Sequence, residues 1–153
     1  MGSMNLIAKY NIAVPRYTSY PTLPYWNKTP SQAEWKNHVS KTFAASNSKN
    51  GISVYIHLPY CESLCTYCAC NTRITINHLV ERPYIDSLLK EWHLYLNVFN
   101  EKPKIKEIHL GGGTPTFFSA ENLRFLIQSI LDTSQKIDSA EFSFEAQIGR
   151  AHV

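Results

Sequence analysis

The sequence predicts an α/β fold built on a parallel sheet, because segments with a strand pattern alternate with segments with a helical pattern. The strand patterns cover 52–58, 105–110 and about 140–146, and an apolar stripe of helical spacing lies between each strand and the next. Strands and helices that alternate in this way form βαβ units, whose strands run parallel. The composition suits a packed domain, since 44% of the 153 residues are hydrophobic and 18% are charged.

An N-terminal arm and a helix precede the first strand. Residues 8–26 are rich in Pro, Tyr and Thr, and Pro15 and Pro21 exclude a helix interior there. The helix is predicted to begin with Thr29 as its N-cap and to end near Ala45, before a polar turn. Its apolar stripe is formed by Trp35, Val39 and Phe43.

The first strand places apolar and polar side chains on opposite faces. One face carries Ile52, Val54, Ile56 and Leu58. The other face carries Ser53, Tyr55 and His57. Pro59 ends the strand and a cluster of cysteines begins at Cys61, so the cysteine loop follows the C-terminal end of a strand.

Further alternating elements complete the pattern. A helix over about 83–99 presents Ile85, Leu88, Trp92, Leu96 and Phe99 on one side. The strand 105–110 runs into a glycine turn at 111–114, and Ser119 can cap a later helix. The stripe of that helix is formed by Leu123, Leu126, Ile127, Ile130 and Leu131. The last strand places Phe142 and Phe144 on one face and Glu141, Ser143 and Glu145 on the other.

Charge and hydropathy exclude several classes of protein. The net charge of +3 is too small to indicate a nucleic-acid-binding protein. No apolar run approaches the ~18 residues of a transmembrane helix. The N-terminus lacks the basic and apolar regions of a secretory signal, so the expected location is the cytoplasm.

All four cysteines lie in one short loop, at Cys61, Cys65, Cys68 and Cys70. Clustering of this kind indicates metal or redox chemistry rather than a disulfide framework. The first three thiolates can hold three corners of a four-iron cluster and leave the fourth iron open to a small molecule. Cys70 is expected to point away from such a cluster. A structural zinc site, or cysteines that bind no metal, are the alternatives that spacing alone leaves open.

Motifs around this loop add a resemblance. Cys-x-x-x-Cys-x-x-Cys after one strand and Gly-Gly-Gly-Thr-Pro-Thr after the next resemble the radical S-adenosylmethionine (SAM) superfamily. The segments Lys9-Tyr10-Asn11, 15–22 (Pro-Arg-Tyr-Thr-Ser-Tyr-Pro-Thr) and Cys68-Ala69-Cys70-Asn71 further resemble bacterial oxygen-independent coproporphyrinogen III oxidases. Heme chaperones and other cluster-binding proteins of the superfamily are the alternative, although heme chaperones typically lack the arm and the Cys-x-Cys ending.

This resemblance implies a cofactor set and a reaction. Cys61, Cys65 and Cys68 would hold a [4Fe–4S] cluster, and SAM would bind its fourth iron. Reductive cleavage of SAM would give a radical that takes a hydrogen from two propionate side chains of coproporphyrinogen III, and loss of carbon dioxide would give protoporphyrinogen IX. An electron donor such as a flavodoxin-type protein is expected as partner, with a monomeric full-length enzyme.

The resemblance also assigns roles to single residues near the cysteine loop. Tyr55 would lie near SAM and the cluster, and Tyr67 would meet SAM through its backbone. Glu145, at the end of the last strand, would bind SAM as well. For Tyr55 and Glu145, packing inside the barrel and an exposed strand end are the respective alternatives.

The glycine turn and the arm supply the remaining candidates. Gly112, Gly113 and Thr114 would contact the amino group of SAM, since a backbone without side chains allows close approach. The alternative there is a simple tight turn. Arg16 could pair with a propionate carboxylate of the substrate, because a guanidinium forms forked hydrogen bonds with carboxylates.

The implied architecture is the N-terminal part of a radical SAM partial (β/α) barrel, preceded by the arm and helix. Residues 1–50 would form the arm and helix, 51–147 the first part of the barrel, and 148–153 a non-native or truncated tail. The segment after Glu145 departs from the family pattern. Without the rest of the barrel the sheet would keep an open edge, so we expect this chain not to be catalytically competent alone.

Overall fold

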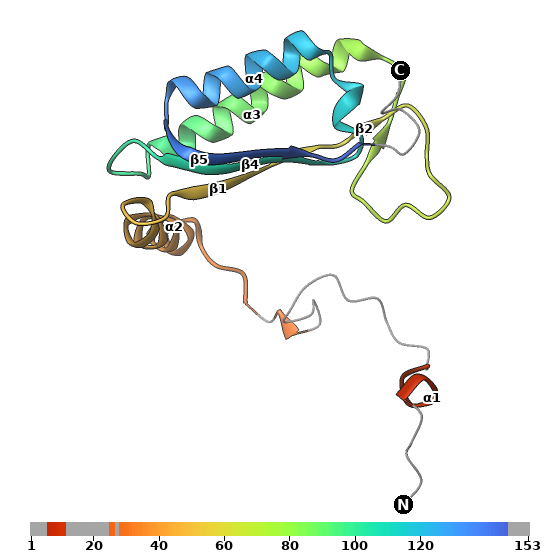
Figure 1. Cartoon of the computed structure of the whole chain (residues 1–153), viewed down its shortest axis with the longest axis horizontal. Coiled ribbons are helices and arrows are strands. Elements are labelled where there is room, and N and C mark those ends of the chain that lie inside the picture. The colour runs from red at the N-terminus through yellow and green to blue at the C-terminus, as the bar shows by residue number, and fades with distance from the viewer. Residues whose placement is uncertain (1–5, 12–24, 27, 147–153) are drawn as a thin grey trace, which may run out of the picture.

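A computed structural model describes residues 6–11, 25, 26 and 28–146. The predicted arm, Arg16 included, lies for the most part outside these residues. In chain order the elements are α1 (Leu6–Tyr10), α2 (Gln32–Asn47), β1 (Ile52–Leu58), β2 (Tyr60–Cys61), β3 (Arg73–Ile74), η2 (His78–Val80), α3 (Glu81–Leu96), β4 (Lys104–Gly112), η3 (Pro115–Phe117), α4 (Ala120–Asp132) and β5 (Gln135–Phe144). Figure 1 shows α3 and α4 together over one face of the sheet formed by β1, β4 and β5.

The main sheet is parallel and has the order β1-β4-β5, as the alternating pattern predicts. Its register places Tyr55 beside His109 and His109 beside Ser143. Residues paired in a parallel sheet share a face, so these polar side chains form one row across the strands. The carboxyl ends of all the strands lie at one edge, where the cysteine loop begins (Figure 1).

α2 begins later than the sequence pattern predicts. Ser31, not Thr29, is the N-cap: the backbone N–H of Glu34 donates to its hydroxyl over 3.2 Å. The carboxylate of Glu34 in turn accepts from the backbone N–H of Ser31 over 2.8 Å, which completes a capping box. The prediction from Thr29 was wrong because a nearby serine has an acidic partner at the right spacing, and a carboxylate is also favourable at the helix N-terminus.

β5 begins at Gln135, several residues before the predicted start at Ala140. Its first residues are polar and lack a strand pattern, but they pair with the beginning of β4, where Gln135 lies beside Lys104. The backbone N–H of Gln135 donates to the carbonyl of Pro103 over 2.8 Å. Hydrogen bonds from a neighbouring strand therefore extend β5 where its own side chains give no signal.

The core lies between the sheet and the pair α3–α4. Its buried hydrophobic residues are Ile56, Leu58, Ile85, Trp92, Ile105, Ile108, Leu110, Phe117, Phe118, Leu126 and Ile130. This confirms the apolar face of β1 and the stripes predicted for α3 and α4. The stripe of α2 is confirmed in part: Phe43 is buried and stacks on Phe99 with centroids 3.9 Å apart, but Trp35 is 51% exposed.

A buried asparagine joins α2 to the start of β4. Asn47 is 0% exposed, and its side-chain oxygen accepts from the backbone N–H of Lys104 over 2.7 Å. Its amide nitrogen donates to Glu101 Oε1 and to the carbonyl of Lys102. All its polar atoms are therefore paired, which makes its burial favourable.

The outer strand β5 is less well covered than the middle strand. Phe142 and Phe144 pair with Ile108 and Leu110 and so face the helix layer, yet they are 45% and 61% exposed. Within the described part of the chain, no helix is long and apolar enough to cross a membrane.

Candidate iron–sulfur and SAM site

A short second sheet closes the cysteine loop. β2 and β3 pair in parallel, with Tyr60 beside Arg73 and Cys61 beside Ile74. The backbone N–H of Thr75 donates to the carbonyl of Cys61 over 2.9 Å. The two ends of the cysteine loop therefore lie side by side (the yellow-green loop of Figure 1). The sequence did not predict this pairing, because each strand has only two residues.

The glycine turn after β4 packs directly against the start of the cysteine loop. The backbone N–H of Gly113 donates to the carbonyl of Leu58 over 2.8 Å, and that of Thr114 donates to the carbonyl of Tyr60 over 3.0 Å. Cys61 Sγ lies 3.3 Å from Thr114 Oγ1. The structure thus brings together two predicted site segments that are about fifty residues apart in the chain.

All three glycines of this turn are closely surrounded, and a Cβ on Gly111 would lie 2.8 Å from the Tyr55 ring. Gly112 has a φ of +115°, and a Cβ placed there would lie 2.8 Å from the His57 ring. A Cβ on Gly113 would lie 2.8 Å from the backbone of Pro59 and 2.9 Å from Cys61 Sγ. A side chain on Gly113 would displace the first cysteine, so this residue determines how closely the thiol approaches the turn.

The remaining cysteines lie on the outer part of the loop. Cys65 and Cys68 are partly exposed, and the backbone N–H of Cys68 donates to the carbonyl of Cys65 over 3.0 Å. Cys70 is exposed, and its thiol lies close enough to Cys68 to interact with it. Desolvation, a hydrogen bond with Cys68 and the nearby charges of Glu145 and Cys61 all raise the pKa of its thiol.

Polar side chains on the sheet face opposite the helices form the second part of the site. His109 Nδ1 lies 2.7 Å from Ser143 Oγ, and its Nε2 lies 3.4 Å from Glu145 Oε1. The Tyr55 ring stacks on the His109 ring with centroids 5.6 Å apart. The other carboxylate oxygen of Glu145 accepts from the backbone N–H of Gly112 over 3.3 Å, which joins this row to the glycine turn.

A histidine on the same face orients the predicted tyrosine. His57 Nε2 lies 2.8 Å from the carbonyl of Asn71, so this nitrogen carries the proton and Nδ1 can accept from the Tyr55 hydroxyl at 3.4 Å. Desolvation raises the pKa of Tyr55, and the charge of Glu145 raises it further, so the phenol stays protonated near neutral pH. Tyr67, in contrast, has a side chain that is 83% exposed.

The sequence marked the two outer residues of this row as candidates but not the two between them. Tyr55 and Glu145 were predicted as site residues, whereas His109 and Ser143 were not. The signal was present, because His109 lies on the strand that ends in the glycine turn and Ser143 shares the polar face of β5 with Glu145. Only the strand register shows that the two side chains meet.

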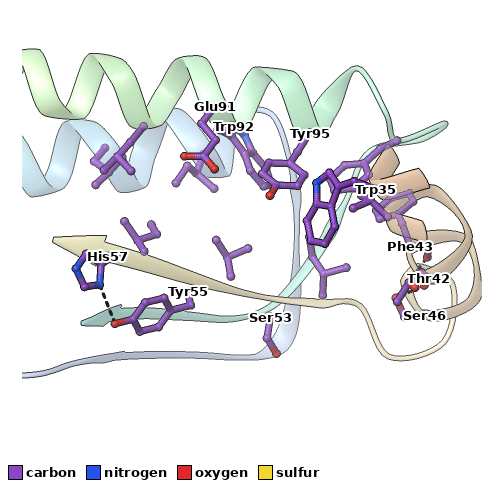
Figure 2. A pocket seen from close by; sticks show the side chains of 18 of the residues that line it. Trp35, Thr42, Phe43, Ser46, Ser53, Tyr55, His57, Glu91, Trp92 and Tyr95 are labelled. Atoms are coloured by element: carbon purple, nitrogen blue, oxygen red, sulfur yellow. Dashed lines mark hydrogen bonds between the residues drawn. The ribbon is translucent and has the colours of Figure 1, made fainter. Parts of the chain in front are cut away.

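An apolar pocket of about 620 Å³ runs along the free edge of β1, between that strand, α2 and α3. Figure 2 shows Trp35, Phe43, Trp92 and Tyr95 on one side of the strand, and Tyr55 and His57 on the other. No cysteine lines it. Of the polar row, the pocket therefore touches Tyr55 alone, with His57 beside it.

The donor set fits a four-iron cluster. Three partly exposed thiols come from one loop, and the glycines beside Cys61 add no side chain to the adjoining space. Among the described residues, no group of three or more His, Cys, Asp or Glu side chains converges so as to hold a single metal ion. A cubane does not require that convergence, since each thiolate binds a different iron.

Known proteins resemble this chain. It is 32% identical over 143 residues to oxygen-independent coproporphyrinogen III oxidase from Synechocystis, which covers 94% of this chain and 30% of that protein. It is 34% identical over 143 residues to the protein of that name from Mannheimia haemolytica, covering 92% of both chains. No protein-family model matches the chain.

A solved structure gives the same result. Coproporphyrinogen III oxidase from Escherichia coli, described as a radical SAM enzyme, superimposes with a TM-score of 0.72 and 26% identity over 92% of this chain and 30% of the other. The parallel βα fold is therefore that of the N-terminal part of a radical SAM barrel. The chain spans about 30% of the length of the Synechocystis relative but most of the Mannheimia haemolytica protein. By this sequence identity and coverage, the chain belongs to the family of oxygen-independent coproporphyrinogen III oxidases.

Proposed function

We propose that this chain forms the cluster-binding and SAM-binding part of an oxygen-independent coproporphyrinogen III oxidase. The observation that supports this most directly is the meeting of three segments at one end of the sheet: the cysteine loop, the glycine turn and the end of β5. Cys61 lies 3.3 Å from Thr114, and Glu145 lies 3.3 Å from the backbone N–H of Gly112.

In this proposal Cys61, Cys65 and Cys68 hold a [4Fe–4S] cluster. When bound, such a cluster, with SAM at its fourth iron, supplies the electron and the radical chemistry that oxidative decarboxylation needs. The protein supplies the positions: β2 and β3 hold the two ends of the loop together, and Gly113 lets Cys61 approach the turn. Cys70 serves as a neighbour of the cluster rather than a ligand.

SAM binds between the glycine turn and the polar row. In this proposal Glu145 accepts from the amino group of SAM, and the position of its carboxylate beside the backbone N–H of Gly112 supports this role. The backbone of Gly112, Gly113 and Thr114 lines the same space, and Tyr55 flanks it with a hydroxyl held by His57. The exposed Tyr67 contributes through its backbone.

Coproporphyrinogen III is the proposed substrate, and Arg16, outside the described residues, is the proposed partner of a propionate. Residues 51–147 would be the first part of the barrel, residues 1–50 an N-terminal arm and helix that precede it, and 148–153 a non-native or truncated tail. An electron donor of the flavodoxin type, a monomeric full-length enzyme and a cytoplasmic location complete the proposal.

The proposal is tested by anaerobic reconstitution of the chain with iron and sulfide, followed by absorbance and reduced-state electron paramagnetic resonance (EPR) spectra with and without SAM. We expect a brown protein with about four irons per chain, whose reduced signal changes when SAM is added. Cys68→Ala should lose the cluster, whereas the matched variant Cys70→Ala should retain it. A colourless chain that holds zinc instead would contradict the proposal.

A further inference from the structure

One histidine joins the cysteine loop to the helix layer. His78, the first residue of η2, has Nδ1 2.8 Å from Glu81 Oε1 and Nε2 3.4 Å from Glu62 Oε1. Its ring stacks on the buried Phe117 of η3, with centroids 4.3 Å apart and planes at 15°. The imidazole is thus held by contacts on both nitrogens and on one face.

Glu81, the partner of His78 in the helix layer, is held by further hydrogen bonds. Glu81 is 3% exposed, and its Oε2 accepts from the backbone N–H of Ser119 over 2.9 Å and from Asn122 Nδ2 over 2.7 Å. Both donors belong to the start of α4, so the carboxylate joins the first turns of α3 and α4. Its other oxygen, Oε1, faces His78. A buried carboxylate with partners on both oxygens is a rigid anchor.

The outer end belongs to the cysteine loop. Glu62 follows Cys61 directly in the chain, and its carboxylate is the second partner of His78. Both carboxylates can accept from the ring and neither can donate to it, so the two contacts favour the protonated form of His78. A continuous path therefore runs from α4 through Glu81 and His78 to the residue beside Cys61.

We propose that His78 is a positioning residue that clamps the cysteine loop to the helix layer through Glu62 and Glu81. The clamp holds the loop before any cofactor binds, so that Cys61 keeps its place beside the glycine turn. The purpose of this positioning, to bind a cluster, rests on the proposed function. The contacts of the clamp itself are present in the metal-free chain.

The clamp is tested by amide hydrogen exchange of loop residues 61–70 in the whole metal-free chain. His78→Ala and Glu62→Gln should each lower protection of these amides by about three- to tenfold, and the double variant should be no worse than His78→Ala. His93→Ala, an exposed histidine on α3, is the matched control and should change nothing there. Unchanged loop protection in both single variants, or losses that simply add, would overturn the clamp.

Glu62→Gln separates the clamp from general stability, because it leaves the pair of His78 and Glu81 intact. If His78→Ala also exposes α3 and α4, the Glu62→Gln result alone decides: a loss confined to the loop supports the clamp, and no loss overturns it.

The EPR spectrum of the reconstituted cluster tests whether the clamp affects the cysteine site. In reconstituted chains, Glu62→Gln should broaden the reduced-cluster EPR signal and speed the removal of iron by a chelator by about threefold or more. An unaltered spectrum and release rate would argue against a positioning role. If the unmodified chain takes up no cluster, the proposed function fails, while hydrogen exchange still decides the clamp.

Discussion

One face of the sheet lies under α3 and α4, while the opposite face carries the polar row of Tyr55, His109, Ser143 and Glu145. On the covered face, Leu58, Ile105 and Ile108 are at most 1% exposed. On the polar face, Tyr55 is 58% exposed and its neighbours are held by hydrogen bonds and ring stacking. Both faces belong to the same strands, and adjacent residues differ only in the direction of the side chain.

The difference shows that stability and function draw on different kinds of interaction here. Burial of apolar area on the covered face supplies the driving force for folding. The side chains of the polar face are held instead by a few hydrogen bonds and ring contacts. Each of these contributes little to stability, and polar atoms of this face remain accessible to a ligand. Substitutions on the two faces should therefore have separable effects.

The largest effect on stability is expected from Leu126→Ala. Leu126, on α4, is 0% exposed within the core, so its truncation leaves a cavity and should lower the free energy of unfolding by about 2–5 kcal/mol. Leu94→Ala is the matched control: that leucine is 67% exposed on α3 and should change stability by less than about 0.5 kcal/mol. Urea unfolding followed by circular dichroism measures both. Equal losses in the two variants would contradict the assigned core.

A smaller loss is expected at the glycine turn. Gly112→Ala should lower the free energy of unfolding by about 1–3 kcal/mol, because alanine is strained at a φ of +115° and its Cβ would meet the His57 ring. The same urea titration measures it. A double variant that adds His57→Ala removes the contact but keeps the strain, so it should recover only part of the loss. Full recovery would show that backbone conformation is not the cause.

The β1 strand and the two helices of the covered face could be predicted from the sequence, whereas the buried Phe117 and Phe118 were not. The alternation in β1 and the stripes of α3 and α4 depend on the local spacing of apolar residues, and local spacing is what burial selects. Ser119 was likewise predicted as a cap and accepts from the backbone N–H of Asn122. The start of β5 could not be predicted, because its polar residues form a strand only by pairing with β4.

The site was predictable only where a motif marks it. The cysteine loop and the glycine turn have distinctive spacings, and the structure brings them into contact. His109 has no local signature, because its partner Ser143 lies on another strand. Glu81 pairs locally with His78, but its contacts with Ser119 and Asn122 depend on helix packing.

Neighbouring residues on β1 give a narrower test of the two faces. Val54 packs partly buried against the core, and Val54→Ala should lower the free energy of unfolding by about 1 kcal/mol. Tyr55→Phe, on the opposite face, loses only a long hydrogen bond to His57 and should cost less than about 0.5 kcal/mol. Thermal and urea unfolding of both variants check this order. A larger loss of unfolding free energy for Tyr55→Phe than for Val54→Ala would mean that the polar face contributes more to stability than the covered face at this position.

The smallest effect should be a pH dependence that comes from the His78 clamp between the helix layer and the cysteine loop. A hydrogen bond with Glu81, aided by the charges of Glu81 and Glu62, raises the pKa of His78 above its ordinary value of 6.5. A raised pKa means that the folded chain binds the proton more tightly. The clamp therefore contributes fully below about pH 6.5, and its contribution is lost as the pH rises through the higher folded value.

Glu81 sets the acidic limit of the pH range in which the clamp contributes to stability. Burial alone would raise its pKa, but hydrogen bonds from Asn122, Ser119 and His78 outweigh burial and lower it below its ordinary value of 4.5. Its contribution is present above about pH 4.5 and is lost as the pH falls through the lower folded value. Stability should thus be greatest between these limits and decline slightly from pH 6.5 to 8. In His78→Gln that decline should vanish, because glutamine does not titrate, while the acid limb set by Glu81 remains. A decline of equal size in both proteins would assign it to groups other than His78, and urea unfolding at stepped pH values distinguishes the two results.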